Sequence, residues 1–392
     1  MFRHLFKIVW NKKKQNFLMI LEIFVSFIVL FAVFALIVFN VTNYNRPMGF
    51  EYEKVWSISF NLGNNERDSI INYYGPVNNL LKSMPEIEES SWTGANFPFS
   101  NSNSNTDIEY NKIKIMSDFH QVGDDFRKVI NASMAEGRWF GKQDDGLKNR
   151  PIVINQTLKD RLFKNESPIG KVVSSEFEKT GQVVIGVVAD FKDKGDFQRQ
   201  EASYYRRIDT SGNRLGENSI LIKLRSPQDA TFEAKLQKEL SKVVRGANIE
   251  IDYLAGMRKS KNSFTIIPLI IFLIVSGFLI LNVSLGLFGI LWYNINKRRS
   301  EIGLRRAVGA TGVNISWYFM AEALVLTTLA LIVGFFFAVQ FPLLNVFDVS
   351  AGVYLTAIVF AALFIYILVL ICSFYPGKQA AGIYPAVALH ED

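Results

Sequence analysis

The residues best suited to enzyme chemistry are too few and too scattered to form a catalytic constellation. Histidine occurs three times, at His4, His120 and His390, and the single cysteine, Cys372, lies in an apolar run. A Ser-His pair or a zinc site needs several such side chains close together in one compartment. One cysteine also excludes an intramolecular disulfide. We therefore expect no catalytic residue and no metal site.

Motifs of hydrolase and nucleotide chemistry are missing from the sequence as well. It holds no G-x-S-x-G and no H-E-x-x-H pattern, which serine hydrolases and zinc proteases use to place their reactive groups. The nearest match to a phosphate-binding loop, Gly170-Lys171, is followed by Val172 instead of Ser or Thr. We expect no cofactor in this chain and no enzyme activity of its own.

One short segment combines charged and apolar residues in an ordered pattern. It reads KRRSEIGLRRAVGA from Lys297 to Ala310, and residues 301–307 are expected to form a helix that ends where Gly309 lets the backbone turn. Such a helix can dock into a groove of a soluble partner, with its charges setting the orientation and Ile302 and Leu304 becoming buried. The alternative is a basic loop that only fixes membrane topology, which would not need this pattern.

Four charge-poor runs flank or precede this segment and indicate a membrane protein. The chain has 392 residues, of which 49% are hydrophobic and 20% charged, whereas about 25% charged residues are usual in a soluble domain. Each run has the roughly 20 apolar residues needed to cross a bilayer. The predicted membrane helices are residues 17–39, 263–292, 317–339 and 352–372. The first run is too long for a cleaved signal peptide.

The basic residues predict the orientation of these helices. Residues 1–16 carry five Lys and Arg and no acid, and the loop 293–316 carries five against Glu301 alone. Because such segments stay in the cytoplasm, both termini are expected inside, including the tail 373–392. Residues 46–262 then form one large extracytoplasmic domain. It holds 32 basic and 30 acidic residues, a net charge of +2, which gives no reason to expect nucleic acid as a partner.

The second run is longer than a bilayer requires. Residues 263–292 would form a helix of about 45 Å at 1.5 Å per residue, against a hydrocarbon core of about 30 Å. We expect it to project toward the large domain, and a strongly tilted helix is the alternative. Its small residues should allow close approach to another helix, within the chain or across a dimer. They are Gly277, Ser284, Gly286 and Gly289.

The large domain has the mixed periodicity of an α+β fold, and we expect it to consist of two subdomains. A helix is expected at 229–243, where apolar residues recur at helical spacing behind Pro227 and Asp229. Residues 100–106, SNSNSNT, are expected to be a polar loop without core residues. The expected strands are 55–60, 113–116, 151–154, 183–188, 219–224 and 249–253.

Two acids lie inside the predicted membrane helices, Glu22 and Glu322. A carboxylate at the bilayer centre costs about 2.5 to 3.5 kcal/mol, but both lie near the cytoplasmic ends of their helices. One interpretation is structural, with each acid reaching the interface or pairing with Lys or Arg there. The other is a role in transmitting motion between helices.

Two motifs in the C-terminal third resemble the FtsX-like permease domain. The first joins a basic run to E-I-G, an R-A-x-G-A segment and a membrane helix that carries an acid, here Glu322. The second is the P-A-x-x-A…P-x-x-A-L spacing, with Gly377 in place of the usual Ala. Its matching residues are Pro376, Ala380, Pro385, Ala388 and Leu389. The resemblance covers residues 263–389.

The large domain resembles the MacB-type periplasmic core domain. The resemblance rests on GRWF at 137–140, PIGK at 168–171 and VIGVV at 184–188. Together the two resemblances imply a MacB-like, FtsX-like permease of the type VII ABC superfamily. Its fold would have four transmembrane helices and a large α+β extracytoplasmic domain between helices 1 and 2. Such proteins are dimers that relay movement from a cytoplasmic ATPase, rather than pass substrate through a membrane channel.

The resemblance also implies site residues and partners. MacB carries its ATPase in the same chain, and no such domain occurs in this sequence, so a separate P-loop ATPase subunit that binds ATP and Mg is expected. The amphipathic N-terminus, residues 1–16, would lie along the inner membrane face. The implied ATPase-coupling residues are Glu301, Ile302, Gly303, Leu304, Arg305, Arg306 and Gly309.

The expected function is efflux of a peptide, drug-like or lipid-like substrate by a multi-pass protein of the cell inner membrane. Further expected partners are a second permease subunit, the same or different, a periplasmic adaptor and an outer-membrane channel. One alternative within the same mechanism is lipoprotein release or control of a cell-wall hydrolase. An alternative of another class is a membrane sensor without an ATPase.

Overall fold

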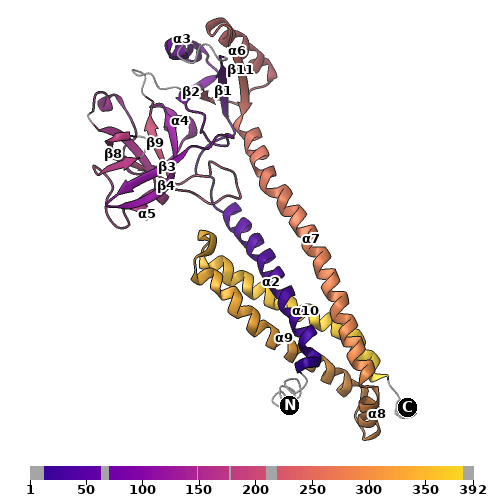
Figure 1. Ribbon diagram of the computed structural model, residues 1–392. Coiled ribbons are helices and arrows are strands. Elements are labelled where there is room, and N and C mark those ends of the chain that lie inside the picture. The colour runs from indigo at the N-terminus through magenta and orange to yellow at the C-terminus, as the bar shows by residue number, and fades with distance from the viewer. Residues whose placement is uncertain (1–12, 63–69, 148, 176–177, 209–218, 383–392) are drawn as a thin grey trace. The chain divides into compact units, whose positions relative to one another are not determined.

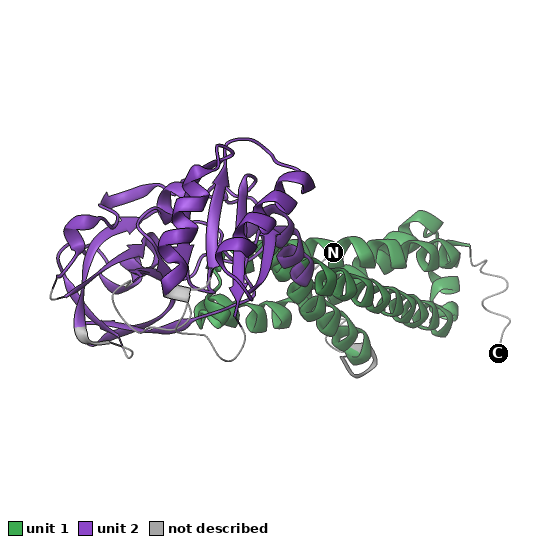
Figure 2. Cartoon of the chain, turned by 90° about the horizontal axis from the view of Figure 1, so that it is seen from above, with its two compact units in different colours: residues 1–42, 266–392 green, residues 43–265 purple. Residues whose placement is uncertain are grey.

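The computed structural model describes residues 13–62, 70–147, 149–175, 178–208 and 219–382. The chain divides into two compact units (Figure 2). The helical unit comprises Met1–Thr42 and Ile266–Asp392, and the α/β unit comprises Asn43–Thr265. Each unit has its own hydrophobic core, so each is described by itself.

Four helices of the described chain are long and apolar enough to cross a membrane. Each contains one of the four predicted runs and extends beyond it, which confirms the predicted set of transmembrane helices. A short helix, α8, follows the second of them (Figure 1). The helices are α2 (Lys13–Tyr44), α7 (Leu254–Lys297), α8 (Arg299–Ala307), α9 (Gly312–Leu343) and α10 (Ala351–Ala381), with a 3-10 turn η2 (Val346–Asp348) between the last two.

The core of the helical unit draws side chains from α2, α7, α9 and α10, and one of its contacts joins α2 to α9. Phe27 of α2 is fully buried, and its ring meets that of Phe335 edge-on at 5.4 Å. Gly334 makes this approach possible, because a Cβ there would lie 2.5 Å from Phe27 Cδ1. The small residue therefore lets two membrane helices pack without a gap.

The α/β unit is built on one continuous sheet that closes on itself at one end. The strands follow the order β11-β1-β10-β2-β4-β3-β7-β8-β6-β9, and β9 also pairs with β4, which closes a ring of six strands. β5 pairs with β8. The strands are β1 (Val55–Asn61), β2 (Ile87–Thr93), β3 (Asn105–Tyr110), β4 (Ile113–Val122), β5 (Met134–Gly137), β6 (Arg150–Asn155), β7 (Val172–Ser175), β8 (Glu178–Val188), β9 (Ser203–Arg207), β10 (Ser219–Leu224) and β11 (Asn248–Tyr253).

Separate cores fill the two ends of this sheet, in agreement with the expected subdomains. Residues Trp56, Ile58 and Phe60 alternate along β1 toward a core shared with α3 and α6. Figure 1 shows both helices beside β1 and β11 at the top of the view. A second core, around Ile152 and Tyr204, fills the six-stranded ring. The helices are α3 (Ile70–Ser83), α4 (Phe126–Ile130), α5 (Gln156–Leu162) and α6 (Ala230–Val243), with a 3-10 turn η1 (Lys142–Asp144).

All six expected strands of this unit are present, and so is the expected helix 229–243. Asp229 caps α6, since its Oδ1 accepts hydrogen bonds from the backbone of Thr231 and Phe232 at 3.0 and 3.2 Å. The expectation of a polar loop over residues 100–106 is wrong at its end. β3 begins at Asn105, and Thr106 is buried because it pairs with Ser117 of β4.

Helix α7 starts well before the apolar run that predicted it. It begins at Leu254, directly after β11, and Leu254 is fully buried in the core of the α/β unit. Residues 254–265 of the helix belong to that unit. This agrees with the expected projection of the second membrane helix toward the large domain.

Candidate functional site

The predicted docking helix exists as α8 and is held by a small apolar cluster of the helical unit. Ile302 is 1% exposed and packs with Ile295, Ile315, Phe319 and Ala380. Those four residues come from α7, α9 and α10. The helix ends before Gly309, whose φ of +101° suits glycine and turns the chain toward α9. Three membrane helices therefore fix the position of α8.

A charged network, which we call the Arg298 network, ties α8 to α9. Arg298 Nη1 donates to both carboxyl oxygens of Glu322 at 2.8 and 3.0 Å. Its Nε donates to Glu301 Oε2 at 3.0 Å. Arg305 Nη2 donates to the other oxygen of Glu301 at 2.6 Å. Such charge-assisted bonds to arginine fix geometry as well as charge.

Aromatic rings of α9 flank both arginines of this network. The Arg298 guanidinium lies 5.2 Å from the ring centre of Phe319, and that of Arg305 lies 4.4 Å from Tyr318. These distances are in the range of cation–π attraction. The first turns of α9 thus supply both a carboxylate and two ring faces to α8.

Arg306 makes the contact to the fourth membrane helix. Its Nη1 donates to the carbonyl oxygen of Ala381, the last residue of α10, at 2.7 Å. A cation there satisfies a free carbonyl at a helix C-terminus. Gly312 leaves room for the pair, since a Cβ there would lie 2.9 Å from Arg306 Nη1.

The side chains that α8 leaves exposed to a partner agree with the expectation for Leu304 but not for Ile302. Leu304 and Val308 are 58% and 83% exposed, four residues apart at the C-terminal end of α8. Val313 and Trp317, on the first turns of α9, are exposed too. The expectation that Ile302 would be buried by a partner is corrected, because the chain's own core already buries it.

The two membrane acids have different surroundings. Glu322 is 7% exposed and neutralised by Arg298, which fits the structural interpretation. Glu22 lies against α7, where a Cβ at Gly286 would overlap its carboxylate. Gly286 therefore makes the close helix approach expected of the small residues. A Cβ at Gly277 or Gly289 would meet no neighbouring segment within 4 Å, so these two glycines make no such approach within the described chain.

Only part of the C-terminal motif lies within the described residues. Pro376 and Ala380 are buried in α10. Gly377, the departure from the usual Ala, is where α9 comes closest, since a Cβ there would lie 2.9 Å from Ser316 Oγ. Pro385, Ala388 and Leu389 lie outside the described residues, as do residues 1–12 of the expected amphipathic N-terminus 1–16.

Several residues of the site were not found from the sequence. Arg298 was seen only as one of five basic residues of the loop, and Tyr318 and Phe319 only as part of an apolar run. The sequence feature that could have identified Arg298 is its i, i+3 spacing from Glu301, which favours an ion pair on a helix. Nothing in the sequence paired Arg298 with Glu322.

The α/β unit holds a cavity of about 770 Å³ between α3, β2 and the ends of β4 and β9. Its charges are largely paired: Arg207 donates to Asp124 at 2.6 and 2.7 Å and also binds Asp145. Among the residues that the structure describes, no group of three or more His, Cys, Asp or Glu side chains is arranged to hold a metal ion.

Two family models match the chain. The MacB-like periplasmic core domain matches residues 17–239, more than half of the chain, and the FtsX-like permease C-terminal domain matches residues 269–385. Both resemblances drawn from the sequence are thereby confirmed.

Curated relatives are named macrolide export ATP-binding/permease protein MacB. That of Aggregatibacter actinomycetemcomitans is 28% identical over 57% of this chain and 35% of its own length. That of Neisseria gonorrhoeae is 24% identical over 78% of this chain and 48% of its own length. That of Bdellovibrio bacteriovorus is 24% identical over 80% of this chain and 48% of its own length. The chain thus spans about half or less of the length of these relatives.

Solved structures show a weaker likeness to the chain. The periplasmic region of MacB from Actinobacillus actinomycetemcomitans is 20% identical with a TM-score of 0.39, over 53% of this chain and 92% of that one. The extracellular domain of YknZ, a noncanonic ABC-type transporter from Gram-positive bacteria, is 14% identical with a TM-score of 0.36, over 50% and 98%.

Proposed function

Because the chain belongs to the family of the MacB-like periplasmic core domain, with an FtsX-like permease domain at its C-terminal end, we propose that it is an ABC transporter permease. A separate cytoplasmic ATPase drives it, and its membrane helices relay the movement to the α/β unit. ATP and Mg bind to that ATPase, not to this chain. A second permease subunit completes the membrane part.

The proposed orientation puts α8 and both termini in the cytoplasm and the α/β unit in the periplasm. The support is the charge of residues 293–316, which hold five Lys and Arg against Glu301 alone. The loop between α9 and α10 carries only Asp348. The helical unit then lies in the inner membrane.

The observation that carries the proposal is the way α8 is presented. Ile302 and the Arg298 network hold it to the membrane helices, while Leu304 and Val308 remain exposed. An apolar side chain on a helix fixed at several points suits a groove of a soluble partner. A force applied to α8 would therefore be transmitted to α7, α9 and α10 together. Glu301, Arg305 and Arg306 orient the helix in this proposal, and Gly303 and Gly309 shape it.

Co-purification from native membranes tests this proposal. We expect the tagged full-length chain to bring down a P-loop ATPase, and Leu304→Glu to lose it, because a charge replaces the apolar contact. Leu344→Glu is the matched control, since Leu344 is also an exposed leucine and lies at the far end of α9. Equal ATPase recovery with L304E would remove the docking role. No ATPase with the unaltered chain would favour the membrane sensor.

The substrate class we propose is exported drug-like, peptide or lipid-like molecules. The support is the printed name of the curated relatives, macrolide export, and we propose a periplasmic adaptor and an outer-membrane channel as further partners. Deletion of the gene should increase sensitivity to macrolides or related compounds. Accumulation of lipoproteins in the inner membrane, without such sensitivity, would instead favour lipoprotein release.

A further inference from the structure

Residues 191–197, FKDKGDF, contact the ends of both membrane helices that enter the α/β unit. We call them the joint segment. They lie in the chain soon after β8. The helix residues they touch, Asn43 and Tyr44 of α2 and the first turns of α7, belong to the α/β unit. The joint segment is therefore one piece of backbone that meets two membrane helices.

The joint segment holds α7 through a charged and fully bonded carboxylate. Arg258 of α7 donates to both oxygens of Asp196, at 2.9 and 2.8 Å. Asn262, one turn later, donates to the same carboxylate at 2.7 Å and accepts from the backbone N–H of Asp196 at 2.9 Å. Asp196 is 3% exposed. Bidentate pairs of this kind are among the strong polar contacts in proteins.

The hold on α2 is weaker in kind. Lys192 Nζ donates to the carbonyl oxygen of Tyr44 at 3.1 Å, and Asn43 Nδ2 donates to that of Phe197 at 3.1 Å. The rings of Tyr44 and Phe197 stack at 5.5 Å. These bonds reach neutral carbonyls, which hold less strongly than a carboxylate that accepts from arginine. The two helices are thus attached unequally.

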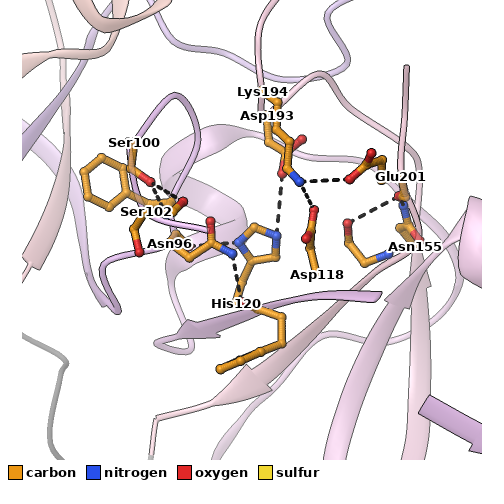
Figure 3. Close-up of polar contacts among 12 residues, drawn as sticks. Asn96, Ser100, Ser102, Asp118, His120, Asn155, Asp193, Lys194 and Glu201 are labelled. Atoms are coloured by element: carbon orange, nitrogen blue, oxygen red, sulfur yellow. Dashed lines mark hydrogen bonds and ion pairs between the residues drawn. The ribbon is translucent and has the colours of Figure 1, made fainter. Parts of the chain in front are cut away.

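Side chains at the centre of the joint segment fix it to the six-stranded ring. Figure 3 shows Lys194 between Asp118 and Glu201, and Asp193 facing His120. Lys194 Nζ lies 2.9 Å from Glu201 Oε2, and His120 Nε2 lies 3.6 Å from Asp193 Oδ2.

The proton positions in this cluster follow from one carbonyl. His120 Nδ1 donates to Asn96 O at 2.8 Å, since a carbonyl can only accept. Burial raises the pKa of Asp193. The segment thus has a firm base in the α/β unit.

We infer that the joint segment transmits movement of α7 to the α/β unit, with Asp196 as the positioning residue. Movement of α2 is transmitted through this segment to a smaller extent, because its contacts are weaker. This inference rests on the proposed function, because it needs a driven α7. It follows from the contacts that Asp196 makes: a pull on Arg258 or Asn262 loads the joint segment directly, and the ion pairs of Lys194 carry that load into the ring. A pull on α2 loads weaker contacts, two hydrogen bonds to carbonyls and one ring stack, besides the backbone that leads from α2 to β1.

The first test uses the full-length chain in lipid nanodiscs without a partner. Hydrogen exchange is compared between Asp196→Asn, which keeps the shape but removes the charge, and Asn43→Ala, its matched control on α2. We expect D196N to speed exchange of the amides of residues 254–262 about tenfold or more, and N43A to affect only the last turn of α2. Unchanged exchange at residues 254–262 in D196N would overturn the inference.

The second test asks whether movement is transmitted, which a merely structural contact would not affect. Spin labels at Lys238→Cys of α6 and Leu355→Cys of α10, in a Cys372→Ser background, report one intramolecular distance in the complex with the co-purified ATPase. We expect ATP, Mg and vanadate to shift this distance in the unaltered joint and in N43A, but not in D196N at equal ATPase activity.

If the distance between the spin labels shifts as much in D196N as in the unaltered chain, at equal ATPase activity, the inference is overturned. If N43A loses the shift in distance to the same extent as D196N, α7 and α2 do not have unequal roles. No shift in the unaltered complex would contradict the proposed function instead, and the exchange measurement would then still decide the contact at Asp196.

Discussion

One arginine–carboxylate pair lies near each end of helix α7, and the two pairs have similar geometry. Arg258 lies in its first turns and Arg298 follows its last residue. Each guanidinium bonds both oxygens of one carboxylate, Asp196 or Glu322. Each also lies over an aromatic ring, 4.7 Å from Tyr52 and 5.2 Å from Phe319 respectively. One helix is therefore fastened in both units by the same chemistry.

The difference between the two pairs lies in what surrounds them, because Arg298 also bonds a second acid, Glu301. Asp196 takes one arginine, and an asparagine and its own backbone complete its bonding. In the Arg298 network, Glu301 is shared by Arg298 and Arg305. Glu301 is bonded to two arginines and can lose one while it keeps the other, at small cost. The Arg258–Asp196 pair is a closed pair, meaning that its one arginine must break both hydrogen bonds before either residue can move. The pair in the α/β unit thus suits a fixed joint, and the network in the helical unit suits a switch.

Arg298→Ala should have the largest effect on stability. It leaves the carboxylate of Glu322, which is 7% exposed, without its cation, which costs about 3 kcal/mol for a buried pair. Thermal unfolding of the full chain in detergent measures the loss. The control is Arg298→Ala with Glu322→Gln, which removes the orphaned charge and should recover much of it. If the double variant is no more stable than R298A, then Glu322 is not the cause.

Acid should weaken the closed pairs of the α/β unit, and Asp144 offers the clearest case. The hydrogen bond from Arg138 lowers the pKa of Asp144, although burial opposes the shift. A lowered pKa means that the stabilisation is complete above the unfolded value of about 4 and disappears as the pH falls through the folded value.

Asp144→Asn should therefore cost about 1 kcal/mol at neutral pH, because Arg138 is 42% exposed and solvent screens the pair. Denaturant unfolding of D144N and the unaltered chain at pH 7 and pH 3 measures this. The two curves should converge on acidification. A gap that stays constant with pH would show that the charge of Asp144 contributes nothing.

Glu301→Gln should have the smallest effect on stability and a clear effect on coupling. The pair with Arg305 is partly exposed, so its loss costs about 0.5 kcal/mol, while Arg298 keeps Glu322. We expect thermal stability close to that of the unaltered chain, but ATP hydrolysis by the partner that no longer depends on substrate. Unchanged coupling would mean that Glu301 is a static link, and the contrast with Asp196 would fail.

Features that depend on neighbouring residues in the chain could be predicted well. The cap at Asp229, the strand 219–224 and the glycine turn at Gly309 all follow from local patterns. The site could be predicted only in part. Leu304 was found as an exposed apolar residue, but Ile302, two positions earlier, was assigned to the same surface and is buried. Which face of a nine-residue helix lies inward depends on α9 and α10, which its own pattern does not describe.

Length and charge along the chain were enough to predict the four helices of the described chain that can cross a membrane, and the large domain inserted between the first two, because bilayer thickness and topology act on consecutive residues. Only the tertiary structure decided how its helices are fastened. Arg258 bonds a residue 62 positions away and Arg298 one 24 positions away, and β9 closes the ring by pairing with β4. Such partners are chosen by packing in three dimensions, where any of several carboxylates could have served.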